Sequence, residues 1–252
     1  MKLIALDSSG SVATVAIASE DRLLAEYSLD NGMTHSQTML PMLDEITKLS
    51  GISMDEIDAV AVAGGPGSFT GLRIGSATAK GIALALKKPV ISVPTLEALA
   101  YNVYGSPYLV CPMMNARRQQ AYTALYRFVP WETQLSLSIL EDQTAEDVRE
   151  WCGKINGYKE DVLLLGDGAQ DFAGILQEEL QVPVHFAPMH LNRPKAGSLA
   201  QRAIQYYKMG RFQQGRMHRP VYLRASQAER ERARRGQETQ PGKGQHFFES
   251  DD

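Results

Sequence analysis

Cysteine is scarce in this sequence. Of its 252 residues only Cys111 and Cys152 are cysteines, too few for a disulfide framework and without the paired spacing of a zinc site. We therefore expect a cytoplasmic, reducing environment. An apolar run near the N-terminus is interrupted at residues 7–11, too early for a signal peptide, and no apolar stretch reaches the roughly 18 residues of a membrane span. Secreted disulfide scaffolds and membrane-spanning proteins are therefore not expected.

An overall basic charge is also missing. The formal net charge is −3, so the chain cannot wrap nucleic acid by bulk charge. Residues 211–235 nevertheless carry eight arginines and only two glutamates, a local charge of +6 that leaves −9 for the rest. Residues 224–235 are helix-prone and fit either a solvated tail or an RNA-contacting arm. Residues 236–252 are polar and turn-rich, and we expect them to be disordered.

Alternating apolar residues and turn signals predict a two-lobed α/β protein. Three strands over residues 2–8, 11–19 and 22–28 form an antiparallel meander, and the pattern then continues as helix, strand, helix, strand, helix up to residue 104. This order favours a mixed sheet with helices on its faces. Thr34 is expected to cap the first helix, and Pro41 to kink it or delay it to about residue 40.

The pattern restarts after a turn at residues 105–107. We expect strands at 108–115, 121–128 and 161–165, and helices at 144–152, 170–180 and 196–208. The predicted domains are a first lobe at 1–106, a smaller second lobe at 107–210, and a basic, then disordered, tail at 211–252. The last helix of the second lobe is expected either to stay with it or to pack back on the first lobe.

A glycine-rich turn is the densest motif in the chain. Gly64-Gly65-Pro66-Gly67-Ser68-Phe69-Thr70-Gly71 joins a predicted strand to a predicted helix, but it lacks the lysine of a P-loop and the GxGxxG spacing of a dinucleotide fold. Phosphate binding at the helix N-terminus stays possible. The spacing of Gly71, Gly75, Ala79 and Ala83 favours another interpretation, a small-residue stripe against which a second helix packs closely. Ile74, Ala77 and Leu84 would then face the sheet.

Common catalytic constellations are absent from the sequence. Ser68 lacks the flanking glycines of a nucleophile elbow, and none of the five histidines forms an i, i+4 pair for a metal. Asp7, at the end of the first strand, fits either an acid that holds Mg²⁺ and phosphate or an ordinary polar turn. Residues 166–168 form a second glycine turn, which could face a nucleotide or simply connect two elements. His35 fits a capping or packing residue better than a ligand.

Five stretches carry a family resemblance. LIALDSSGSVATVAI, THSQTMLPMLDEI, AVAGGPGSFTGLRIG, NARRQQAY and RPVYLR together resemble the bacterial TsaB (YeaZ) family over residues 1–224. The resemblance implies an actin/Hsp70-like (ASKHA, RNase H-like) fold. It also implies a part in making N6-threonylcarbamoyladenosine at position 37 of tRNA.

In such systems the paralogue TsaD holds the metal and performs the transfer, and the ATPase TsaE supports turnover. The resemblance therefore implies a non-catalytic scaffold without cofactor or metal. It places Thr95 and Leu99 where the catalytic paralogue has its metal-binding histidines. It also places Asn115 at a position where the family usually has aspartate, which puts any acidic role there in doubt.

The implied partners are TsaD and TsaE, with a homodimer possible in isolation and tRNA reached only through the complex. The rival hypothesis is an ATP-dependent phosphotransferase that uses Asp7 and residues 166–168, and a third is a simple RNA-binding module led by the basic tail. For the scaffold we predict a partner interface on the two helices after the meander, formed by His35, Met39, Leu43, Ile46, Gly71, Arg73, Gly75 and Ala79.

Overall fold

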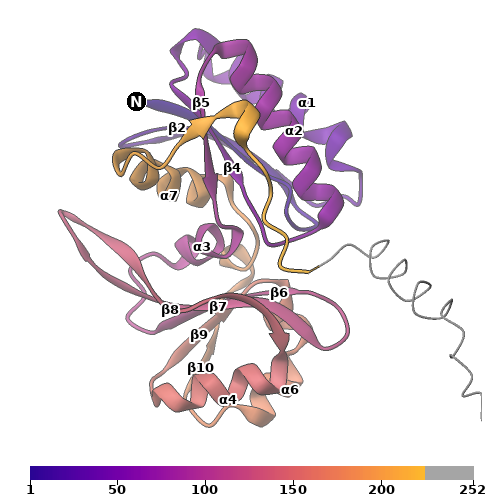
Figure 1. Cartoon of the computed structure of the whole chain (residues 1–252), viewed down its shortest axis with the longest axis vertical. Coiled ribbons are helices and arrows are strands. Elements are labelled where there is room, and N and C mark those ends of the chain that lie inside the picture. Colours follow the sequence, from indigo (N-terminus) through magenta and orange to yellow (C-terminus); the bar gives the residue numbers. More distant parts are fainter. Residues whose placement is uncertain (225–252) are drawn as a thin grey trace, which may run out of the picture.

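Residues 1–224, which the computed structural model describes, form two lobes stacked along the long axis of the molecule (Figure 1). The predicted basic segment from residue 225 onward and the predicted disorder at 236–252 lie outside the described residues. None of the described helices is both long and apolar enough to cross a membrane.

A six-stranded mixed sheet forms the centre of the first lobe, in the order β11-β5-β4-β1-β2-β3. β1 pairs antiparallel with β2 and parallel with β4, so the predicted meander and crossovers are confirmed. The strands are β1 (Lys2–Asp7), β2 (Ala13–Ser19), β3 (Leu23–Leu29), β4 (Ala59–Ala63), β5 (Pro89–Val93) and the short β11 (Gln213–Gln214).

Helices cover both faces of this sheet. α1 (His35–Ser50) and α2 (Phe69–Leu86) bury apolar side chains against one face, and α7 (Ala196–Lys208) packs on the other. α1 is regular from His35, so the prediction that Pro41 delays it is wrong. Pro41 and Gln37 are exposed, and water can bond the Gln37 carbonyl that the proline leaves without a donor. Thr34 occupies the N-cap position, but its side chain makes no capping hydrogen bond.

The second lobe repeats the strand order of the first. Its sheet runs β10-β9-β6-β7-β8, with a meander followed by two parallel strands. α4 (Val148–Tyr158) and α6 (Ala173–Glu179) cover the outer face, and α3 (Thr95–Ala100) lies between the lobes (Figure 1). The strands are β6 (Leu109–Asn115), β7 (Gln120–Trp131), β8 (Gln134–Asp147), β9 (Val162–Leu165) and β10 (Val184–Phe186). The predicted two-lobed α/β fold, with a mixed sheet and flanking helices in each lobe, is confirmed.

Several sequence-based predictions in the second half are wrong or incomplete. The long strand β8 is missing from the prediction although its first half, residues 134–140, alternates as a strand does, and its polar second half contains the start of the helix expected from residue 144, which begins at Val148. β10 was not predicted, and the helix expected at 170–180 is two shorter ones, α5 (Asp167–Asp171) and α6. Residues 211–224 are part of the folded body and not a separate tail, because β11 pairs with β5 of the first lobe and Arg224 bonds the Ala116 carbonyl of the second.

Candidate functional site

A cavity of about 630 Å³ lies between the lobes. Five segments line it: the β1–β2 turn, the glycine-rich turn with the start of α2, the β6–β7 hairpin, the start of α5, and the last described residues. The side chains and backbone that line it come from Ser9, Gly10, Ser11, Gly67, Ser68, Phe69, Thr70, Met114, Asn115, Ala116, Arg117, Tyr122, Asp167, Tyr222, Leu223 and Arg224.

Asp7 lies behind this lining, at the end of β1. Its Oδ1 accepts a hydrogen bond from the Ser9 N–H at 2.8 Å, and burial raises the pKa of its carboxyl group. This is the geometry of the polar turn, one of the two interpretations that the sequence allowed. Ser9 itself is buried and lines the cavity, and its Oγ has no hydrogen-bond partner among the described residues.

The N–H groups of the glycine-rich turn are largely occupied by the chain itself. Gly64 donates to the Val93 carbonyl at 2.7 Å, Gly65 to Thr95 Oγ1 at 3.1 Å, and Ser68 to the Ser9 carbonyl at 2.7 Å. Gly71 N–H donates to Ser68 Oγ, which caps α2. These four groups are therefore not free for a phosphate, whereas Gly67, Phe69 and Thr70 line the cavity and their N–H groups bond no other described residue.

The small-residue stripe on α2 packs within its own lobe. A Cβ on Gly71 would lie 2.0 Å from the Ser8 carbonyl oxygen, and one on Gly75 would lie 2.5 Å from Ser8 Oγ. The prediction of close approach is therefore correct in kind, but the neighbour is the end of β1 and not another helix. The prediction that Ala77 and Leu84 face the sheet is wrong, because Ala77 is exposed and Leu84 is 80% exposed; Ile74 is partly buried.

Most of the predicted interface residues are buried in the first lobe. Met39, Leu43 and Ile46 of α1, like Ala79 of α2, belong to its apolar core. The prediction that these side chains form a partner interface is therefore wrong for this conformation, because the apolar face of α1 packs on the chain's own sheet. It is also wrong for Gly71 and Gly75, which pack against the end of β1. His35 is partly buried and its Nε2 hydrogen-bonds the Gly10 carbonyl at 2.9 Å. Of the predicted set, Arg73 is exposed, with its guanidinium 4.0 Å from the Phe69 ring centre.

The segment after β11 crosses the glycine-rich turn, which sequence analysis missed. His218 is fully buried between Ser76 Oγ at 2.8 Å and Ser92 Oγ at 3.2 Å, and burial lowers its pKa to about 4. Val221 N–H donates to the Gly64 carbonyl at 2.7 Å. A Cβ on Gly65 would lie 2.3 Å from the Val221 carbonyl oxygen, so this glycine makes the crossing possible. RPVYLR was the available signal, but it carried no indication of where the segment packs.

This segment then reaches the second lobe. The Tyr222 ring lies 4.7 Å from that of Phe69, and the guanidinium of Arg224 donates to the Ala116 carbonyl. We call residues 218–224 the strap, because they are anchored on the first lobe and end on the β6–β7 hairpin of the second.

Asn115 and Asp167 meet on the second-lobe side of the cavity. Asp167 Oδ1 accepts from the N–H groups of Gly168 at 2.9 Å and Asn115 at 3.3 Å, and burial raises the pKa of Asp167. The Asn115 amide donates to Asp171 Oδ2 at 2.6 Å. An aspartate at position 115 would lose this donor and repel Asp171, which explains why an amide suits this chain.

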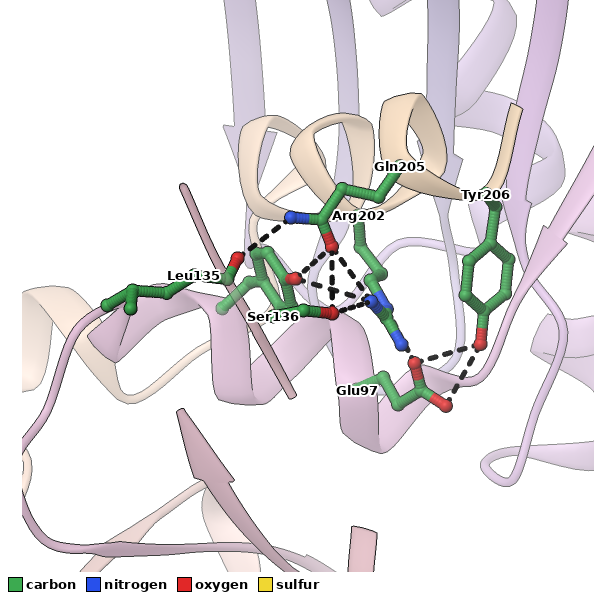
Figure 2. A network of polar contacts seen from close by, with 7 residues as sticks. Glu97, Leu135, Ser136, Arg202, Gln205 and Tyr206 are labelled. Atoms are coloured by element: carbon green, nitrogen blue, oxygen red, sulfur yellow. Dashed lines mark hydrogen bonds and ion pairs between the residues drawn. The ribbon is translucent and has the colours of Figure 1, made fainter. Parts of the chain in front are cut away.

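A buried polar network of side chains from α3, α7 and β8 joins the two lobes (Figure 2). Arg202 Nε of α7 donates to Glu97 Oε2 of α3 at 2.6 Å, and both side chains are about 5% exposed. Arg202 also donates to Ser136 Oγ of β8 at 3.0 Å. Gln205 donates to the Leu135 carbonyl at 2.9 Å, and Tyr206 O–H bonds the Glu97 carboxylate. The network therefore connects α7 of the first lobe with β8 of the second.

Within residues 1–224, no cluster of three or more His, Cys, Asp or Glu side chains is arranged to hold a metal ion. Thr95 and Leu99 of α3, the positions where the resemblance implies metal-binding histidines in the paralogue, are both buried. Thr95 Oγ1 accepts from the Gly65 N–H, and Leu99 packs in the core between the lobes. Neither side chain has a nitrogen, sulfur or carboxylate ligand, so these positions do not fit such a metal.

Comparisons with known proteins agree with this geometry. The family model described as TsaD, tRNA N6-adenosine threonylcarbamoyltransferase, matches residues 30–232. The TsaB protein of Bacillus subtilis is 28% identical over 79% of this chain and 86% of its own length. The TsaB protein of Escherichia coli is 35% identical over 50% of this chain, a match that spans only 55% of its own length. A crystal structure from Pseudomonas aeruginosa, described as similar to peptidase YeaZ, has 26% identity and a TM-score of 0.75 over 88% of this chain and 99% of its own.

Proposed function

Because the chain belongs to the family of TsaD, the tRNA N6-adenosine threonylcarbamoyltransferase, and within it to the TsaB/YeaZ proteins of tRNA threonylcarbamoyladenosine biosynthesis, we propose that it is a non-catalytic subunit of the complex that makes this nucleoside. In this proposal it binds the catalytic paralogue TsaD and the ATPase TsaE in the cytoplasm, and the complex modifies position 37 of tRNA.

The observation that carries this proposal concerns the two positions where the resemblance places the metal-binding histidines of the catalytic paralogue. Thr95 and Leu99 are buried and committed to internal contacts, and neither can bind a metal. The two cysteines are buried, and burial raises the pKa of each thiol to about 11, so neither is an activated nucleophile. These residues suit a protein that holds partners and leaves the chemistry to one of them.

We place the contact with TsaD on the exposed face of α2. Arg73, Ala77, Gly81 and Ala85 recur every four residues on that face, and Leu84 is 80% exposed beside them. A Cβ on Gly81 would have no neighbour within 4 Å, so a partner helix can approach this face closely. α1 packs beside α2 and adds Leu40, which is 53% exposed. Family membership supports TsaD, itself a paralogue with the like helix, as the occupant of this face.

The phosphotransferase alternative has one observation in its favour, the cavity between the lobes with Asp167 in its wall. Against it, the glycine-rich turn bonds its own chain and Asp7 lies behind the lining. Calorimetry with Mg²⁺ and ATP distinguishes the two hypotheses, since tight binding by the isolated chain would favour the phosphotransferase.

The proposed function is tested by omission. A reconstituted mixture of TsaD, TsaE, this chain, threonylcarbamoyl-AMP, ATP and unmodified tRNA should form the modified nucleoside, and the mixture without this chain should lose most of that activity. The nucleoside is measured by mass spectrometry after nuclease digestion. Transfer by the purified chain alone, or undiminished transfer without it, would show that the scaffold assignment is wrong.

A further inference from the structure

Two arginines line the cavity, and a third stands next to them. Arg117 and Arg118 occupy the tip of the β6–β7 hairpin with exposed side chains, and Arg224 at the end of the strap donates to the Ala116 carbonyl beside them; Arg117 and Arg224 line the cavity. None of the three forms a salt bridge with another described residue. We call Arg117, Arg118 and Arg224 the cationic rim.

The backbone fixes the hairpin tip in an unusual conformation. Arg117, Arg118 and Gln119 have φ angles of 64°, 57° and 58°, so three consecutive residues with side chains lie in the left-handed region. Such conformations are costly and persist where surrounding bonds enforce them. Here Arg117 N–H donates to Asn115 Oδ1 at 2.7 Å, and Ala116 N–H donates to the Gln120 carbonyl at 2.9 Å. The side chains of Arg117 and Arg118 are exposed, so packing in the core does not account for arginine at either position.

An aromatic side chain lies next to the rim. Tyr222 is 38% exposed, lines the cavity and rests against Phe69, whose ring also contacts the Arg73 guanidinium. An exposed ring that packs on a second ring, next to arginines without a salt bridge to another described residue, is the combination that binds single-stranded nucleic acid, with bases stacked on aromatics and phosphates held by cations.

The cavity wall also holds one carboxylate and one unpartnered hydroxyl. Asp167 lines the cavity and accepts the N–H groups of Gly168 and Asn115. Ser9 Oγ is buried and has no hydrogen-bond partner among residues 1–224. Four N–H groups of the glycine-rich turn, those of Gly64, Gly65, Ser68 and Gly71, already bond the chain itself. The arginines and the exposed ring are therefore the groups of this wall that suit a polyanionic strand with bases.

From this arrangement we infer that the mouth of the interlobe cavity binds single-stranded RNA, with the cationic rim on its phosphodiesters and Tyr222 under a base. The inference rests on the proposed function only in naming that RNA as tRNA. It changes the expected role of the chain, because tRNA would be contacted directly by the folded body of this subunit and not only through its partners.

The test measures RNA affinity of the full chain by fluorescence anisotropy, using a fluorescein-labelled, unmodified tRNA transcript at several salt concentrations. Arg117→Gln and Arg224→Gln should each weaken binding about fivefold to tenfold and reduce the slope of log affinity against log salt by about 0.7, the value for one lost single-strand phosphate contact. Arg22→Gln is the matched control, because Arg22 is exposed at the β2–β3 turn, at the opposite end of the sheet from the cavity. All variants keep residues 225–252, so the charge of that segment contributes equally to each.

A second pair of variants tests the stacking platform. Tyr222→Ala should weaken binding about tenfold, and Tyr222→Phe should retain it, because a base stacks on either ring. Retention of affinity and slope in both arginine variants, relative to Arg22→Gln, would refute the inference. Displacement of the RNA by micromolar ATP would do the same and indicate a nucleotide site. Binding of TsaD to the variants is measured alongside, so a failure of the RNA site is distinguishable from a failure of the scaffold role.

Discussion

Single residues in the cavity wall show how burial and hydrogen bonding set their character. Asp7 accepts the Ser9 N–H, which favours its charged form, but burial outweighs this bond and raises its pKa. Asn115 replaces a charge with an amide and thereby gains a bond to Asp171. Burial therefore disfavours the charged form of Asp7, and the amide of Asn115 bonds a neighbouring carboxylate.

The raised pKa of Asp7 predicts a specific pH dependence. The folded state holds this proton more tightly than the unfolded state does, so the residue lowers stability as pH rises above about 4, the unfolded value. Asp7→Asn keeps the Oδ1 acceptor and removes the charge, and we expect it to raise the free energy of unfolding at pH 7 and to have less effect at pH 3. Urea denaturation at both pH values measures this difference.

Asp21 serves as the control with the opposite sign. It is exposed, and its hydrogen bond from the Ser19 hydroxyl lowers its pKa. Asp21→Asn should therefore lower stability slightly at pH 7 and have less effect at pH 3. A loss of stability at pH 7 in Asp7→Asn would mean that its carboxylate is stabilised by its surroundings, contrary to our reading.

At the scale of elements, α2 has two small-residue faces with different neighbours. The face with Gly71 and Gly75 packs on the end of β1, and the face with Ala77, Gly81 and Ala85 is exposed. The small-residue spacing by itself would suggest Gly75→Leu as a test of the interface with TsaD. This variant is unsuitable, because a Cβ at position 75 would lie 2.5 Å from Ser8 Oγ and the substitution would disturb the fold of the lobe. The exposed face offers a substitution that the isolated chain tolerates.

Gly81→Leu is therefore the informative variant for the proposed interface. Leucine has the better helix propensity and open space around it, so the melting temperature should not fall, whereas binding to TsaD should weaken tenfold or more. Calorimetry or size-exclusion chromatography of the mixture measures the binding.

Gly153→Leu in α4 is the matched control, since that glycine is also exposed, helical and free of neighbours within 4 Å. Equal affinity of the two variants for TsaD would exclude this face of α2 as the interface. Dissociation of a homodimer by Gly81→Leu, with TsaD binding intact, would assign the face to self-association.

At the scale of the whole molecule, the lobes are joined at two separate places. The strap links the glycine-rich turn to the β6–β7 hairpin, and the Glu97–Arg202 network links α3 and α7 to β8 (Figure 2). The two connections lie in different parts of the interface between the lobes, so opening the cavity would break at least one of them. We expect a body whose lobes keep a fixed relation, which suits a subunit that positions partners.

The network should also contribute strongly to stability. Glu97→Gln removes the carboxylate and leaves the buried Arg202 charge without its counter-ion, which should lower the free energy of unfolding by about 3–5 kcal/mol. Glu160→Gln, which breaks the exposed pair with Arg127, should cost less than about 1 kcal/mol. Chemical denaturation compares the two. Similar small losses would mean that Arg202 finds water or another partner when Glu97 is neutral.

The order of elements in the first lobe could be derived from the sequence alone, because periodicity and turn residues are local properties of the chain. The meander, the glycine-rich turn and α7 were predicted in this way, whereas the interpretation of Thr95 and Leu99 came from the family resemblance. What sequence could not decide was which surface each face meets. A helical period groups Met39, Leu43 and Ile46, or Gly71 and Gly75, on one side, but burial against the chain's own sheet or a partner leaves the same pattern.

Only the tertiary structure decided the course of the strap and the position of the cationic rim. Residues 218–224 pack on a turn some 150 residues earlier in the chain, through bonds such as Val221 N–H to the Gly64 carbonyl that leave no periodic signal. Arg117 and Arg224 are likewise distant in sequence and meet because the strap ends on the β6–β7 hairpin. Backbone hydrogen bonds and long-range packing leave no pattern in the sequence, and for this reason the folded chain was needed to show that these arginines lie together.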